Sequence, residues 1–171
     1  MPRYVAFLRG VSPQNAKMPE LKRAFESAGF TEVRTLLSSG NVVFNTRKAS
    51  DAAIAKRAEE AMQAELGRSF GSFIRSTEFL QDLLASDPFA AFGLPPESKR
   101  VMTFLNQPPA MVPKLPITLD EATILQCVGA EVFSAYVPGP KGPTFMVLLE
   151  RTFGKDITTR TLATVQKCAV A

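Results

Sequence analysis

The sequence of 171 residues contains no histidine. Without an imidazole group, a Ser-His-Asp triad, a Cys-His nucleophile pair and a histidine metal ligand are all excluded. The two cysteines, Cys127 and Cys168, lie far apart and neither belongs to a CxxC pair, which excludes a structural zinc site and predicts two buried free thiols. The sequence therefore predicts no metal and no cofactor, and any catalysis would have to use carboxylates, lysine, tyrosine or serine.

Long apolar runs are also missing. No stretch approaches the roughly 20 residues that a membrane helix needs, and the apolar run after Arg3 is too short for a signal peptide. We therefore expect a cytoplasmic protein with no membrane partner. Lys and Arg exceed Asp and Glu by 20 to 16, and the pI near 9.3 mildly favours anionic partners such as phosphates or nucleic acid. No basic run occurs, so a solvated surface explains most of these charges.

The apolar periodicity of the first half predicts the element order βαββαβ, which is typical of a ferredoxin-like unit. The helices have clear start and stop signals, namely proline or serine at the start and glycine at the end. In the predicted hairpin, Gly40 or Asn41 would supply the positive φ of the turn. The predicted elements are a strand at 4–8, a helix from Pro19 to Gly29, strands at 33–37 and 42–44, a helix from Ser50 to Gly67 and a strand at 70–75.

The second half repeats this plan less regularly, because the proline-rich segment QPPAMVPKLP (107–116) excludes a long helix. Near the C-terminus, Thr158 and Thr159 are predicted to cap a last helix that has Arg160 in its first turn. A cation there opposes the helix dipole, so Arg160 would need an anion or a buried carboxylate as a partner. The other predicted elements are a helix opening at Thr77, strands at 100–105, 124–128 and 132–137, and a helix from Thr144 to Phe153.

These elements predict an α+β protein of two ferredoxin-like (βαββαβ-type) halves, the second less regular and followed by extra C-terminal helices. We expect an N-terminal ferredoxin-like subdomain over residues 1–76 and a C-terminal α/β subdomain over residues 77–171. The first strand is apolar on both faces, so the face that its own helices leave open needs a partner. The second half of the chain would provide this cover, or a second copy would do so in a homodimer.

Three motifs follow one another along nearly the whole chain: RYVAFLRGV (3–11), VRTLLSSGNVVF (33–44) and LLERTFGKDITTRTLATVQK (148–167). Together they resemble an uncharacterised, mainly bacterial family, domain of unknown function 1697, whose members open with a YVALLRGINVGG-like signature. The resemblance implies two α/β halves and no established activity. The chain differs from the family pattern in three polar segments, at residues 11–18, 139–144 and 161–164.

The loop after the first predicted strand is the first candidate binding site. It carries Arg9, Gly10, Asn15 and Lys17 between a strand end and a helix start, where backbone N–H groups and the helix dipole favour anions. The alternative is that Arg9 pairs with a carboxylate and Gly10 only turns the chain.

Two further segments add candidates with weaker signals. The hairpin turn could offer the groups of Ser39, Gly40 and Asn41, although turn chemistry alone accounts for these residue types. The loop GPKGPT (139–144) precedes a helix, but it lacks the spacing of a phosphate-binding loop and its prolines remove N–H donors. The candidate ligand-binding residues are therefore Arg9, Gly10, Asn15, Lys17, Ser39, Gly40, Asn41, Lys141, Thr159 and Arg160.

The function predicted from these residues is the binding of an anion, either a phosphate-bearing small molecule such as a nucleotide or a nucleic acid, without demonstrated catalysis. One alternative is an enzyme acting on a small phosphorylated or carboxylated metabolite, with Lys17, Lys141 or Tyr136 as acid or base. Another is a homodimeric interaction protein. An RNA-recognition module is disfavoured, because Tyr4 and Phe7 point to opposite faces of their strand and cannot form one stacking surface.

Overall fold

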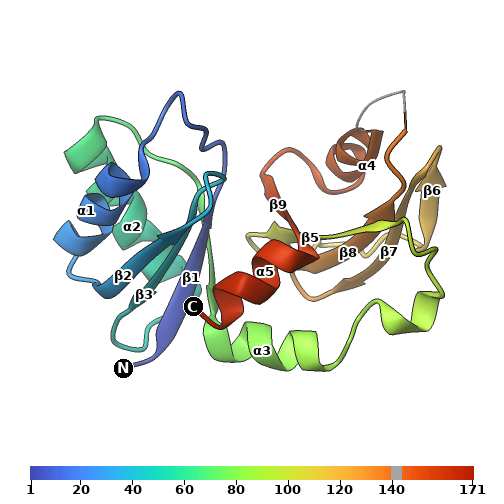
Figure 1. Ribbon diagram of the computed structural model, residues 1–171, viewed down its shortest axis with the longest axis horizontal. Coiled ribbons are helices and arrows are strands. Elements are labelled where there is room, and N and C mark those ends of the chain that lie inside the picture. Colours follow the sequence, from blue (N-terminus) through green and yellow to red (C-terminus); the bar gives the residue numbers. More distant parts are fainter. Residues whose placement is uncertain (140–143) are drawn as a thin grey trace. The chain divides into compact units, whose positions relative to one another are not determined.

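A computed structural model describes residues 1–139 and 144–171 (Figure 1). The chain forms two units, Met1–Asp82 together with Gln166–Ala171, and Leu83–Val165. The first unit contains a four-stranded sheet and the second a five-stranded sheet, and all strand pairs in both are antiparallel. The protein is thus of the predicted α+β class.

The first unit has the strand order β2-β3-β1-β4, which is the ferredoxin-like order, and Figure 1 shows the helices α1 and α2 on one face of the sheet. The predicted start and stop signals are in place: Ser50 accepts a hydrogen bond from the backbone of Ala53, and Gly67 ends the second helix in the left-handed conformation. The elements are β1 (Arg3–Leu8), α1 (Met18–Ser27), β2 (Thr31–Leu36), β3 (Asn41–Asn45), α2 (Asp51–Leu66) and β4 (Ser72–Ser76).

The core of the first unit lies between its sheet and its two helices. Phe44 of β3 packs against Phe25 and Phe30, with the Phe30 and Phe44 ring centroids 4.3 Å apart. On the other face of β1, Val5 and Phe7 are fully buried. The apolar residues on both faces of this strand are therefore removed from water.

The second unit repeats the same arrangement with one helix missing. Its strand order is β6-β7-β8-β5-β9, in which β7-β8-β5-β9 corresponds to β2-β3-β1-β4 of the first unit. Residues 106–116 form no helix between β5 and β6, as their prolines predict. The elements are β5 (Lys99–Leu105), β6 (Ile117–Leu119), β7 (Ala122–Val128), β8 (Glu131–Tyr136), α4 (Thr144–Phe153) and β9 (Ile157–Thr161), preceded by the short helix η1 (Ala90–Phe92).

Two helices, α3 (Thr77–Ala85) and α5 (Leu162–Ala169), include residues of both units. The last residues are tied to the first unit, because Arg3 Nε donates a hydrogen bond to the carbonyl of Ala171 at 2.7 Å and Gln81 donates one to the carbonyl of Ala169. None of the helices in the described residues is long and apolar enough to cross a membrane.

The structure corrects the prediction for the C-terminal helix. Thr158, Thr159 and Arg160 lie in β9 and not at a helix start, and α5 begins only at Leu162. The hydroxyl of Thr161 accepts the capping hydrogen bond from the backbone of Thr164. The β-branched threonines fit the strand equally well, so Arg160 opposes no helix dipole and needs no anion for that reason.

A second correction concerns the cysteines. Cys168 is buried as predicted, whereas Cys127 on β7 is only half-buried. Neither cysteine forms a disulfide, which agrees with the sequence analysis.

Candidate functional site

Three loops meet at one end of the sheet in the first unit. The backbone N–H of Leu8 donates to the carbonyl of Gly40 at 2.8 Å, and the N–H of Arg9 donates to the carbonyl of Gly71 at 2.9 Å. We call this surface the loop edge, and it consists of residues 9–17, 37–40 and 67–71. Most of the candidate residues from the sequence, from Arg9 to Asn41, lie in it or directly beside it.

Gly40 allows the loops 9–17 and 37–40 to pack closely against each other. Its φ is +85°, so the predicted positive φ falls on Gly40, with Leu37 at +59° as a second such residue. A Cβ atom built on Gly40 would lie 2.8 Å from the Cβ of Val11, which is closer than real atoms approach. Only glycine fits this position, because it needs both the left-handed conformation and the missing side chain.

Both asparagines of the candidate set hold loops in shape. The Asn15 side chain accepts a hydrogen bond from the N–H of Ser12 at 2.9 Å and donates one to the carbonyl of Gly10 at 2.8 Å. The buried side chain of Asn41 donates to the carbonyl of Leu36 and to the hydroxyl of Ser39, both at 2.9 Å. These amides therefore stabilise the loop edge from within.

The charges within the three loops of the loop edge are all positive, and the Glu59 carboxylate of α2 lies directly beside them, where it accepts a hydrogen bond from the N–H of Ser72 at 3.1 Å. The three loops contain Arg9, Lys17 and Arg68 and no aspartate or glutamate. All three basic residues are exposed. Lys17 is the N-cap residue of α1 and makes no side-chain capping hydrogen bond there. The arrangement offers three cations to solvent on a backbone that the neighbouring loops hold in place.

The remaining candidates lie elsewhere in the chain. Thr159 and Arg160 belong to the second unit, where the Thr159 hydroxyl is 2.8 Å from that of Thr103 on β5. Arg160 is nearly buried, and its Nη1 donates to the Thr158 hydroxyl at 2.7 Å and to the carbonyl of Thr159 at 3.0 Å. Lys141 lies outside the described residues.

The pKa values of Cys127 and Asp51 are shifted. Burial raises the pKa of the Cys127 thiol, and the nearby Glu131 carboxylate raises this pKa further. Burial also raises the pKa of Asp51 at the start of α2, against the opposing effect of Arg75.

Among residues 1–139 and 144–171, no three acidic or cysteine side chains are grouped as a metal ion would require. Tyr136 stacks its ring on that of Phe145, with centroids 4.2 Å apart.

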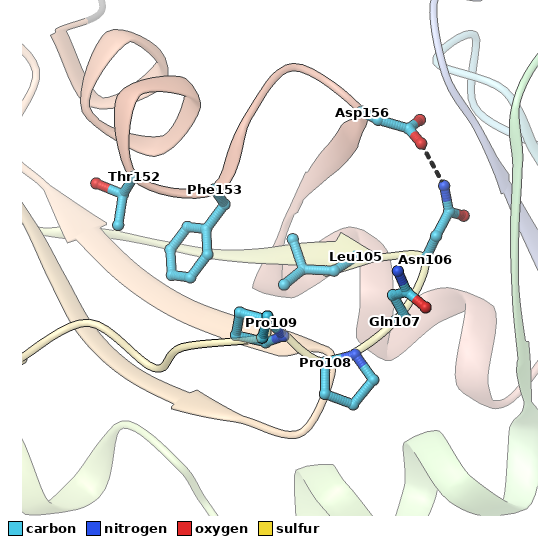
Figure 2. A pocket seen from close by; sticks show the side chains of 9 residues that line it. Leu105, Asn106, Gln107, Pro108, Pro109, Thr152, Phe153 and Asp156 are labelled. Atoms are coloured by element: carbon cyan, nitrogen blue, oxygen red, sulfur yellow. Dashed lines mark hydrogen bonds between the residues drawn. The ribbon is translucent and has the colours of Figure 1, made fainter.

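A cavity of 330 Å³ in the second unit was missed by the sequence analysis (Figure 2). On one side the amide of Asn106 donates a hydrogen bond to the carboxylate of Asp156. These two residues are 50 positions apart, so no sequence motif connects them. The sequence indicated only that both segments are loops, through Gly154 in one and the prolines of 107–116 in the other. Its lining residues are Leu105, Asn106, Gln107, Pro108, Pro109, Ala110, Thr152, Phe153 and Asp156.

The fold defines an α+β protein with two units that share a ferredoxin-like strand order. Residues 1–133 match the model of the family described as "Protein of unknown function (DUF1697)". Because this match covers well over half of the chain, the chain belongs to that family, which confirms the predicted family.

A solved structure described as a conserved bacterial protein from Streptococcus pneumoniae resembles the chain with a TM-score of 0.70. The match covers 99% of this chain and 97% of that one at 17% sequence identity, so it shows the fold alone. No curated protein matches the chain.

Proposed function

We propose that the protein binds phosphate-bearing anions at the loop edge. The observation that supports this proposal is the charge of three loops joined by backbone hydrogen bonds, which contain Arg9, Lys17 and Arg68 and no carboxylate. A guanidinium group can hold two phosphate oxygens at once, and an ammonium group adds a compact positive charge. A phosphate group, carried by a small molecule or by a nucleic acid, is the ligand chemistry that these side chains favour.

The rigidity of the loop edge supports the same proposal. Gly40 packs against Val11, and the amides of Asn15 and Asn41 are hydrogen-bonded within their own loops. A loop that is ordered before binding loses less conformational entropy when the ligand arrives. The basic side chains alone then have to become ordered, which reduces the free-energy cost of binding.

The test is a titration of inorganic phosphate, ATP and a short single-stranded oligonucleotide into the wild type, Arg9→Ala and Lys17→Ala. Arg47→Ala and Lys48→Ala are matched controls, because both residues are exposed and follow β3 at the opposite end of the same sheet. We expect each loop-edge variant to lose about tenfold in affinity, the equivalent of one charge-assisted hydrogen bond, and the controls to lose less than about twofold.

The three ligands separate the possible sources of the phosphate group. A nucleic acid would bind with an affinity that falls steeply with salt, because several phosphates release counterions together. A phosphorylated small molecule would bind as ATP does, with a weaker dependence on salt. Equal affinities in loop-edge and control variants, or no binding of any of the three ligands, would overturn the proposal.

A further inference from the structure

The cavity shown in Figure 2 lies entirely within the second unit, between the start of the proline-rich segment and the end of α4. Its apolar surface comes from Leu105, the rings of Pro108 and Pro109, and the ring of Phe153. The two prolines have fixed φ angles, so this wall is stiff. A volume of 330 Å³ falls at the lower end of the range found for small-molecule sites.

The polar groups of the cavity are mostly hydrogen-bond acceptors. Pro108 and Pro109 have no backbone N–H to offer. The hydroxyl of Thr152 already donates its proton to the carbonyl of Leu148 at 2.7 Å, and the Asn106 amide donates to Asp156. The acceptors that remain are the carboxylate of Asp156 and the side-chain oxygens, and the side-chain donors that remain are the second N–H of the Asn106 amide and the amide of Gln107.

The charge of the cavity is negative, in contrast to the loop edge. Asp156 is the one charged residue among the nine described residues that line it. The protein as a whole has a formal charge of +4, which gives it no general attraction for cations. The electrostatic attraction for a cation bound here would therefore come from the cavity and not from the net charge of the protein.

We propose that this cavity binds a small organic cation, a primary amine with an apolar chain. The ammonium group would donate hydrogen bonds to the Asp156 carboxylate and to neighbouring oxygens, so that the donors of the ligand pair with the acceptors of the cavity. The apolar chain would lie against Phe153, Leu105 and the proline rings, where its burial stabilises the complex. The face of the Phe153 ring also attracts a cation within about 6 Å. This site is independent of the anion site proposed above.

The experiment titrates hexylamine into the full chain and follows backbone amide signals by heteronuclear NMR. Hexan-1-ol and hexanoate serve as neutral and negative counterparts of the same chain length. We expect saturable shifts in residues 105–110 and 152–156 with a Kd of about 1–10 mM, as ligand efficiency allows for so small a molecule. The alcohol and the acid should bind at least about fivefold more weakly than the amine.

Asp156→Asn is the decisive variant, because its side-chain oxygen can still accept the hydrogen bond from Asn106 while the charge is lost. We expect it to weaken hexylamine about fivefold or more and to leave hexan-1-ol unchanged. Asp87→Asn is the matched control, since it makes the same change at an exposed position of the same unit outside the cavity lining, and it should bind hexylamine as the wild type does. Equal affinity for amine and alcohol, equal binding by Asp156→Asn and wild type, or no saturable shift in the lining residues would each overturn the proposal.

Discussion

At the scale of single residues, Gly40 carries the tightest constraint at the loop edge. An alanine there would be strained by the φ of +85°, and its Cβ would lie 2.8 Å from the Cβ of Val11 and 3.1 Å from that of Leu8. We expect Gly40→Ala to lower the free energy of unfolding by about 2–4 kcal/mol, of which about 1–2 kcal/mol comes from the left-handed backbone and the rest from overpacking. Urea denaturation followed by circular dichroism measures this loss.

Gly67 offers a matched control for the Gly40 substitution. Its φ is +72°, but nothing lies within 4 Å of the Cβ that an alanine would add. Gly67→Ala should therefore cost only the backbone contribution of about 1–2 kcal/mol. If the two variants lose the same stability, the contact between Gly40 and Val11 does not constrain the loops as described here.

The backbone conformation of single residues could be predicted from the sequence in part, whereas their contacts could not. The glycine pattern predicted a positive φ at Gly40 or Asn41 and the end of a helix at Gly67, and the structure has the left-handed conformation at both glycines. The contact between Gly40 and Val11 was not predictable, since it joins two loops that are separated by a helix and a strand. The roles of Asn15 and Asn41 were ambiguous for the same reason, as an amide looks the same whether it binds a ligand or its own loop.

At the scale of elements, Arg57 connects α2 to the end of α1. Its guanidinium group donates to the carbonyl of Ala28 at 2.8 Å and to the hydroxyl of Thr46 at 3.2 Å, and it lies over the ring of Phe30 at 4.7 Å from the centroid. A lysine keeps the charge but cannot make both hydrogen bonds and the planar contact together. We expect Arg57→Lys to lower the free energy of unfolding by about 1–2 kcal/mol, measured by thermal or urea denaturation.

Lys56 is the neighbouring control for this prediction. It is exposed and its nearest acidic partner is Glu60, one helical turn away, at 3.9 Å. An exposed pair of this kind contributes little, so Lys56→Arg should change stability by less than about 0.5 kcal/mol. A loss at Lys56→Arg as large as that at Arg57→Lys would show that the guanidinium contacts of Arg57 do not explain its effect.

The elements also show where local sequence signals stop being sufficient. α2 was predictable because a capping serine, helix-forming residues and a terminal glycine agree with one another. Thr158, Thr159 and Arg160 were assigned to a helix start because threonine serves both as a capping residue and as a strand residue. The pairing of Thr159 with Thr103 on β5 decides between the two, and that contact spans 56 positions. Tertiary pairing thus overrode a local signal that allowed both structures.

At the scale of the whole molecule, the chain begins and ends in the same unit. Residues 166–171 belong to the first unit although the preceding stretch, from Leu83 to Val165, forms the second. The composition of the last residues gave no hint of this return, because a short helix with one apolar stripe can pack on any apolar surface. The cavity beside Asp156 depends on the same long-range order, since its two wall segments, at residues 105–110 and 152–156, are separated in the sequence by β6, β7, β8 and the first part of α4.

The return of the chain has a consequence for stability. Deleting residues 166–171 removes the buried side chains of Cys168 and Ala169 and the carbonyl groups that accept hydrogen bonds from Arg3 and Gln81. We expect the deletion to lower the free energy of unfolding by about 3–4 kcal/mol, as the sum of the lost apolar burial and two hydrogen bonds. Hydrogen exchange should speed up more in β1 and β4 than in β7 and β8, because the lost hydrogen bonds belong to the first unit.

Val170→Ala, at an exposed position of the same segment, should leave both measurements unchanged. Equal acceleration in the four strands, or no loss of stability, would mean that the C-terminal residues do not stabilise the first unit through these contacts.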